Sequence, residues 1–278
     1  MNMPELPEVE TVRRGLAPAL EGRIIVRARL FRKDLRFPFP AGLVQRVSGQ
    51  RVHSVERRAK FLLIRLEGGD VLISHLGMSG RYRIHSDAAP AREPHDHFEL
   101  ETDAGCVIRY FDPRRFGILD ICSADELAEQ RFLKGLGPEP LGNAFDGRML
   151  EAGLAGRRTP VKVALLDQRI VAGIGNIYAS EALYRAGISP KRMAKTVLGG
   201  RADRLAAAIR EVLMDAIAAG GSTLRDHRQA TGELGYFQHR FRVYGRDGEK
   251  CSDCDCRNTI LCIRQAGRAT FYCAKRQR

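Results

Sequence analysis

The chain has 278 residues, of which 44% are hydrophobic and 28% are charged, and this composition excludes disorder as the main state. Because domains hold about 100–200 residues, we expect one large domain or two modest ones. The 46 Lys and Arg residues exceed the 33 Asp and Glu residues, so the formal net charge is +13. Such a surplus favours nucleic acid as the partner, with a basic composition inherited from a GC-rich genome as the alternative.

The sequence argues against membrane insertion, secretion and a disulfide framework. No apolar run approaches the roughly 18 residues that span a bilayer, and no basic-then-apolar leader opens the chain. Five of the seven cysteines lie beyond residue 250, and an odd total in such a chain indicates free thiols. The short cysteine-dense tail is therefore interpreted first as a metal site.

The first predicted element is a helix that follows Pro7. Apolar residues recur at helical spacing from Val9 to Leu20, and the pattern stops at Gly22. Short apolar stretches between turn residues come next, and they predict strands at 24–30, 61–66, 71–74, 98–101 and 107–111. Several short strands at this spacing predict a β-sandwich or barrel.

A turn-rich segment at 135–142 predicts a linker between this β-rich half and a helical half. The clearest helix of the second half covers 201–219, where Leu205, Ile209 and neighbouring apolar residues share one face. Gly220 and Gly221 end that helix, a loop follows at 222–234, and the cysteine-rich tail closes the chain.

Eight short motifs carry the candidate chemistry. In chain order they are PELPEVET at 4–11, RRAKFL at 57–62, HLGMSG at 75–80, HDH at 95–97, DPRRFG at 112–117, GIGNIYASEALY at 173–184, GGSTLRDH at 220–227 and GRATFYC at 267–273. Each is a weak signal alone. Together, and in this order over nearly the whole chain, they resemble the formamidopyrimidine-DNA glycosylase (MutM) family of bacterial base-excision repair enzymes.

The resemblance implies an α+β fold: an N-terminal β-sandwich with a long N-terminal helix, a helix–two-turn–helix domain and a C-terminal zinc-finger-like β-hairpin. It divides the chain into a catalytic domain at 1–133, a linker at 134–148, a DNA-binding domain at 149–235 and the hairpin at 236–278. The two domains are expected to form a basic cleft for the duplex.

The family chemistry implied for this chain uses an N-terminal proline. A proline at a free N-terminus is a secondary amine with a pKa near neutrality, well below the value of about 10.4 for lysine, so part of it is an unprotonated nucleophile. By resemblance, Pro4 is the nucleophile, Glu5 the proton donor, Lys60 the proton donor for β-elimination and Arg268 that for δ-elimination. The alternative for Pro4 and Glu5 is the start of a helix, with an acid that favours the helix dipole.

The residues that precede Pro4 bear on this chemistry. As written, Met1, Asn2 and Met3 come first, and they would leave Pro4 as an internal amide without a nucleophilic lone pair. Aminopeptidase trimming removes a Met that precedes Pro, so we expect translation to begin at Met3. If Met1 and Asn2 are retained, the protein should bind lesions without cutting them.

Several further residues match DNA-contacting positions of the family. Met78, Arg114 and Phe116 match the residues that fill the hole left by an everted base, a task that suits a thioether, a guanidinium and an aromatic wedge. Asn176, which opens a helix after Gly175, matches a phosphate ligand. The set also includes His95, Arg157 and Lys162. A core methionine, a surface histidine and a plain helix cap are the alternatives, and the loop at 222–234 resembles the segment that closes over the base.

The tail departs from the family pattern of a four-cysteine zinc finger, because Arg276 stands where the fourth cysteine belongs and an arginine cannot bind zinc. We expect one zinc ion held by Cys251, Cys254, Cys256 and Cys273. Two alternatives remain open: Cys262 as a donor, and a metal-free hairpin held by packing.

The function implied is a bifunctional DNA glycosylase and AP lyase that removes formamidopyrimidines and 8-oxoguanine from damaged double-stranded DNA. We expect a cytoplasmic monomer in the bacterial cytosol or nucleoid. One alternative is an oxidised-pyrimidine glycosylase of the endonuclease VIII type. The other is a non-catalytic lesion-binding protein, which a blocked Pro4 and an incomplete finger would both produce.

Overall fold

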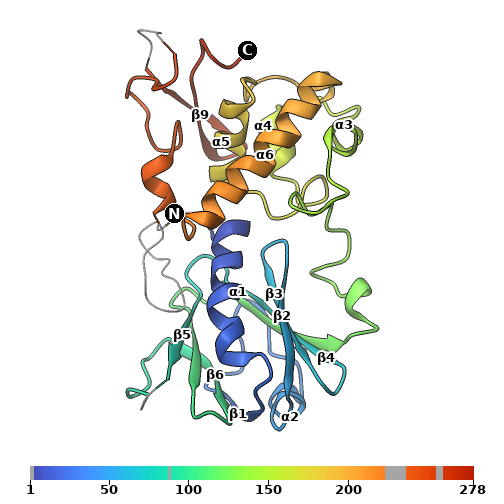
Figure 1. Cartoon of the computed structure of the whole chain (residues 1–278), viewed down its shortest axis with the longest axis vertical. Coiled ribbons are helices and arrows are strands. Elements are labelled where there is room, and N and C mark those ends of the chain that lie inside the picture. Colours follow the sequence, from blue (N-terminus) through green and yellow to red (C-terminus); the bar gives the residue numbers. More distant parts are fainter. Residues whose placement is uncertain (1–2, 87–88, 223–235, 255–258) are drawn as a thin grey trace. The chain divides into compact units, whose positions relative to one another are not determined.

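The computed structural model describes residues 3–86, 89–222, 236–254 and 259–278. The chain divides into two compact units. The first comprises residues 1–134 together with 220–236, and the second comprises residues 135–219 together with 237–278. The predicted α+β class is confirmed, because strands dominate the first unit and helices the second (Figure 1).

The first unit contains two four-stranded antiparallel sheets, with strand orders β1-β6-β7-β5 and β2-β3-β4-β8. Its elements are α1 (Leu6–Leu20), β1 (Ile25–Leu30), α2 (Leu43–Val47), β2 (Val52–Arg58), β3 (Phe61–Leu66), β4 (Asp70–His75), β5 (Arg81–His85), β6 (Asp96–Thr102), β7 (Val107–Phe111), β8 (Ile118–Ser123) and η1 (Leu127–Glu129). Each predicted strand corresponds to one of these, and β2, β5 and β8 are additional.

Helix α1 supplies one wall of the first core. Its apolar face, which includes Val9, Val12 and Leu16, is at most 1% exposed and packs into the same cluster as the inward residues of both sheets. Gly22 has a φ of 75°, a left-handed value that glycine adopts most readily, and so turns the chain away from the helix end. The predicted N-terminal helix is confirmed, and its first turn follows Pro4 and Glu5 directly.

The second unit contains a helical part and a hairpin. Its elements are α3 (Gly147–Leu154), α4 (Val161–Leu165), α5 (Asn176–Arg185), η2 (Ala194–Thr196), α6 (Gly200–Ala218), η3 (Phe237–Arg240), β9 (Leu261–Gln265) and β10 (Arg268–Tyr272). Helices α5 and α6 lie side by side (Figure 1), and most of α5 is buried. Helix α6 confirms the helix predicted at 201–219.

Strands β9 and β10 form the predicted C-terminal hairpin. Gln265 pairs with Arg268, so only Ala266 and Gly267 form the turn, and both have positive φ. A two-residue turn of this kind matches the twist of the strands it joins. Among the described residues, no helix is long and apolar enough to cross a membrane.

Candidate functional site

Pro4 and Glu5 are buried at the start of α1. The carboxylate of Glu8, only 2% exposed, accepts a hydrogen bond of 2.9 Å from the Glu5 amide. The same carboxylate accepts two bonds of 2.8 Å from Ser222, one from its amide and one from its hydroxyl. Glu8 therefore fixes the Pro4–Glu5 dipeptide against the start of the segment at 220–236. Sequence reasoning did not single out Glu8, although the spacing of Glu5 and Glu8 is that of a capping box.

Lys60 lies in the turn that joins β2 to β3, and it is 6% exposed. Its neighbour Phe61 pairs with His75 at the end of β4. Burial, followed by the positive charges of Lys60 and Arg36, lowers the pKa of His75 to about 3. His75 is therefore neutral at pH 7, and its Nδ1 accepts a hydrogen bond of 3.0 Å from the Gly77 amide. This bond shapes the turn that carries Met78.

The His75 environment gives a testable pH dependence. An unfolded histidine has a pKa near 6.5, so the unfolded state binds more protons below that pH. We expect the free energy of unfolding to fall by about 2 kcal/mol from this group between pH 6.5 and pH 5. The substitution His75→Asn keeps an acceptor for Gly77 without a titrating group. The free energy of unfolding, measured by urea melts over this pH range, should therefore fall less steeply for the variant than for the wild type. Parallel pH profiles of the two proteins would contradict the lowered pKa of His75.

The structure brings Met78, Arg114 and Phe116 onto two linked turns. Ser79, next to Met78, donates a hydrogen bond to the carboxylate of Asp112 and accepts one from the Arg114 amide. The Arg114 guanidinium lies over the Phe116 ring, 4.9 Å from its centroid, and Phe116 is 45% exposed. An aromatic and a guanidinium are thus held together at the surface of the first unit.

His95 is exposed directly before β6, and its carbonyl accepts a hydrogen bond of 3.0 Å from the amide of Asp112, whose carboxylate binds Ser79. The His95 ring packs edge-on against Phe111, with centroids 5.6 Å apart. The neighbouring Asp96 is completely buried, with Arg109 Nη1 at 3.9 Å from its Oδ2. A buried charge pair therefore supports the strand start from which His95 projects.

In the second unit, Asn176 opens α5 and lies against the hairpin. Its Nδ2 donates to the Ala269 carbonyl at 3.1 Å and to the Tyr244 hydroxyl at 3.4 Å. Lys162 is completely buried, and its ammonium donates to Asn176 Oδ1, to the Ala269 carbonyl at 3.1 Å and to Thr270 Oγ1 at 2.8 Å. The placement of Lys162 suits holding Asn176 and β10 together rather than touching a ligand itself.

Arg268 and Arg157 differ in how they relate to this cluster. Arg268 is exposed at the first position of β10, directly before Ala269, so the Lys162 contacts fix the backbone beside it. Arg157 follows α3, donates to the Gly153 carbonyl at 2.9 Å and lies 3.5 Å from the Asp167 carboxylate. Among the described residues, no hydrogen bond or ion pair joins Arg157 to Asn176.

Glu181 is a buried residue that sequence reasoning missed. It is 1% exposed on α5, and its carboxylate accepts hydrogen bonds from the amides of Arg242, Val243 and Tyr244 at 2.8–3.1 Å. Burial raises the pKa of Glu181, although these backbone donors lower it. The carboxylate therefore holds Tyr244 at its position next to Asn176. Its place in the GIGNIYASEALY motif was the only available signal.

Replacing Lys162 tests the role of the buried ammonium. In Lys162→Met the stem volume is kept, but three oxygen acceptors lose their donor, so the free energy of unfolding should fall by about 2–4 kcal/mol. Lys195→Met removes one exposed lysine of the same unit and should change it by less than about 0.5 kcal/mol. Equal denaturant midpoints for the two variants would show that the Lys162 contacts contribute nothing.

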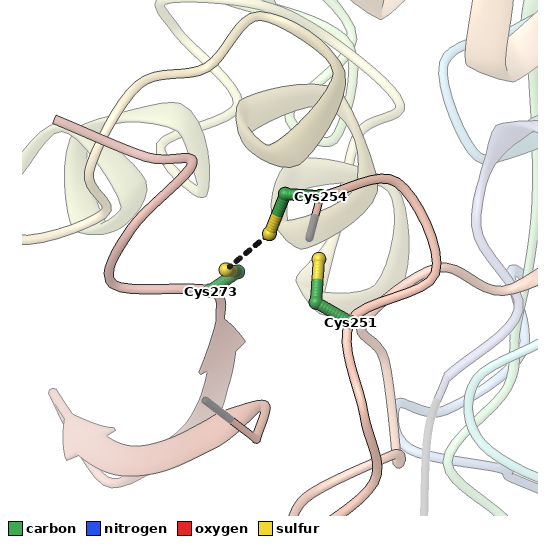
Figure 2. Close-up of side chains that lie close together, drawn as sticks. All are labelled: Cys251, Cys254 and Cys273. Carbon is green, nitrogen blue, oxygen red and sulfur yellow. Dashed lines mark hydrogen bonds between the residues drawn. The ribbon is translucent and has the colours of Figure 1, made fainter. Parts of the chain in front are cut away.

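Three cysteines of the tail form a candidate metal centre. The Sγ atoms of Cys251, Cys254 and Cys273 lie within 4.8 Å of one another, and Figure 2 shows the three side chains turned together. The Cys254 and Cys273 sulfurs are 3.6 Å apart. Zinc bound tetrahedrally at about 2.3 Å from sulfur places its ligands about 3.8 Å apart, so this donor set fits that ion.

The remaining tail residues are separate from this group. Cys262 is exposed on β9 and does not belong to the group. Cys256 lies outside the described residues, as does most of the predicted loop at 222–234. Burial raises the pKa of the Cys251 thiol, but hydrogen bonds from Tyr184 and the Asp253 amide outweigh it and bring the pKa to about 7. Part of this thiol is therefore ready to bind a metal as thiolate.

Comparison with protein families agrees with these features. The formamidopyrimidine-DNA glycosylase N-terminal domain matches residues 3–119, and the formamidopyrimidine-DNA glycosylase H2TH domain matches residues 136–228. The formamidopyrimidine-DNA glycosylase of Ruegeria pomeroyi is 54% identical over 283 residues, covering 99% of this chain and 100% of the relative. That of a Jannaschia species is 55% identical with the same coverage.

Solved structures give the same result. The crystal structure of MutM (Fpg) from Thermus thermophilus matches with a TM-score of 0.87 and 42% identity over 99% of this chain and 98% of that one. Wild-type Lactococcus lactis Fpg, in complex with DNA that contains N7-benzyl-Fapy-dG, matches with a TM-score of 0.89 and 36% identity over 99% of each chain. The shared class is a β-rich N-terminal domain followed by an H2TH domain. The chain belongs to the formamidopyrimidine-DNA glycosylase family.

Proposed function

We propose that the protein is a DNA glycosylase and AP lyase of base excision repair that removes formamidopyrimidines and 8-oxoguanine from double-stranded DNA. The observation that carries the proposal is the Pro4–Glu5 dipeptide, buried and held by Glu8 at the start of α1. Family membership supports the substrate class. A free proline amine at this position supplies a nucleophile, and Glu5 supplies a proton.

The reaction proceeds through a Schiff base. The Pro4 nitrogen bonds to C1′ of the damaged nucleoside while the glycosidic bond breaks, and the base leaves with that electron pair and takes up the proton that the proline nitrogen loses. Glu5 protonates the sugar ring oxygen as the ring opens, which leaves an iminium at C1′. The iminium acidifies the 2′ proton, and its loss expels the 3′ phosphate by β-elimination. A second elimination expels the 5′ phosphate.

The surrounding residues have distinct roles in this scheme. Lys60 donates a proton in β-elimination, and Arg268 binds phosphate and assists δ-elimination. Met78, Arg114 and Phe116 fill the space of the everted base, which offsets part of the cost of unstacking it. Asn176 contacts a phosphate at the start of α5, where amides and the helix dipole favour an anion. His95 and Arg157 add contacts to the DNA backbone, and Lys162 positions Asn176.

We propose further that one zinc ion organises the tail through Cys251, Cys254, Cys256 and Cys273. Thiolates are the ligands that structural zinc sites use, and bound zinc contributes folding free energy to the segment that holds it. The three described sulfurs support this proposal. In this role the residues fix the hairpin that carries Arg268.

Excision from defined duplexes tests the proposed function. The protein should release 8-oxoguanine paired with cytosine at least about tenfold faster than an oxidised pyrimidine in the same sequence. Faster release of the pyrimidine would favour the endonuclease VIII type. Tight, salt-dependent binding without release of either base would favour a non-catalytic lesion-binding protein.

A further inference from the structure

The candidate metal centre has an aromatic neighbour on helix α5, Tyr184. Tyr184 lies in the last turn of α5 and is completely buried, and its hydroxyl oxygen is 3.1 Å from Cys251 Sγ. Both residues belong to the same buried apolar cluster, together with Cys273. A metal-bound thiolate has no proton to donate, so in the loaded site the Tyr184 hydroxyl is the donor.

Arg276 holds Tyr184 from the other side. Its guanidinium lies over the Tyr184 ring, 4.8 Å from the centroid, and its Nε donates to the Tyr184 carbonyl at 3.3 Å. The turn that carries Arg276 is fixed by Gln277, whose side chain accepts from the Cys273 amide at 2.8 Å and donates to the Ile188 carbonyl at 3.0 Å. The arginine is thus attached to both the tyrosine and the segment that supplies Cys273.

Electrostatics makes this arrangement useful to a thiolate centre. Four thiolates around one divalent cation carry a formal charge of −2, and removing that charge from water is costly. A hydroxyl donor on one sulfur disperses part of the charge as a charge-assisted hydrogen bond. The guanidinium adds a positive charge behind the ring and restricts the orientation of the tyrosine.

We propose that Tyr184 and Arg276 are positioning residues of the metal centre, with Tyr184 donating to the Cys251 thiolate and Arg276 holding Tyr184 in place. The inference rests on the proposed zinc site and assigns to Arg276 a supporting role in place of ligation. Groups that orient metal ligands in this way typically account for 10–100-fold in metal affinity.

Metal competition on the full chain tests the pair. Zinc affinity is measured against a chromogenic chelator, and Co²⁺ substitution reports the sulfur-to-metal absorption band. Tyr184→Phe, which keeps the ring, should bind zinc at least about tenfold more weakly and shift that band. Tyr272→Phe removes the hydroxyl of a buried tyrosine of β10, which makes no hydrogen bond to a cysteine among the described residues, and it should leave both readouts unchanged.

The double variant separates positioning from a general charge effect. If Arg276 acts through Tyr184, the single variant Arg276→Gln should weaken zinc binding. In the double variant with Tyr184→Phe, it should weaken zinc binding by less than about a further twofold. Unchanged affinity and spectrum in Tyr184→Phe, or an equal loss in Tyr272→Phe, would overturn the inference while leaving zinc binding intact. A wild-type chain that binds neither zinc nor Co²⁺ would refute the metal proposal itself.

Discussion

Borohydride will covalently trap a chain that begins at Pro4 on a duplex with one 8-oxoguanine opposite cytosine. The expected adduct forms because the reductant converts the C1′ iminium into a stable amine, and peptide mass mapping should place it on Pro4. A matched chain that keeps one residue ahead of Pro4 has a tertiary amide there, which has no nucleophilic lone pair. Its excision rate should fall by at least about 10³-fold.

Binding separates loss of the nucleophile from loss of the fold. Both chains keep the same basic surface and the same Glu8 contacts, so their dissociation constants for the lesion duplex should agree within about threefold. An adduct that maps to a lysine such as Lys60, or equal excision by the two chains, would reject Pro4 as the nucleophile. Weak binding by the extended chain alone would mean that the added residue disturbs the site.

The sequence predicts the elements that have regular apolar spacing or a short apolar stretch. It does not predict the strands in which polar and charged residues separate the apolar ones. Helix α1 was expected from its helical apolar spacing, and strands β1, β3, β4, β6 and β7 from short apolar stretches between turn residues, although β1 buries only Ile25 and Ala28. Strand β2 (Val52–Arg58) has only Val52 and Val55 in the core, and strand β5 (Arg81–His85) only Tyr82, among polar and charged residues. Strand β8 includes Asp120, which is only 8% exposed. Pairing in the sheet, rather than composition, makes these segments strands.

The motif residues were predictable by resemblance, whereas the buried acids that hold them were not. Glu8 bonds to Ser222, 214 residues away, and Glu181 bonds to the Val243 amide, 62 residues away. Asp112 similarly reaches Ser79 across 33 residues. No local pattern encodes such partners, because they depend on how the elements pack. The acids themselves are ordinary in the sequence and become informative only through burial.

In the cysteine-rich tail, the structure reduces the number of cysteines that could bind the metal. From the sequence we expect Cys251, Cys254, Cys256 and Cys273 to bind the metal, with Cys262 as an alternative donor. The described residues bring Cys254 together with Cys251 and Cys273, leave Cys262 exposed, and place Arg276 on Tyr184. Cys254 is thus positioned to serve as a zinc ligand, a role that Arg276 cannot have.

Replacing Cys254 should therefore remove the metal. Four ligands share an apparent zinc-binding free energy of about 10–16 kcal/mol in small zinc modules, so losing one of them should weaken binding by about 10²–10³-fold. Cys254→Ser purified without added metal should retain much less than one zinc per chain by elemental analysis. Cys262→Ser, the matched loss of an exposed thiol, should retain the wild-type amount.

A second change distinguishes a lost ligand from a damaged fold. Adding Arg276→Cys to Cys254→Ser restores a fourth thiol three residues after Cys273, a spacing that suits one metal ion. Zinc affinity should recover at least about tenfold, even though the contact of Arg276 with Tyr184 is lost. Full zinc retention by Cys254→Ser alone would show that other donors complete the site and that Cys254 is dispensable. Equal loss in Cys262→Ser would instead make that exposed thiol a ligand.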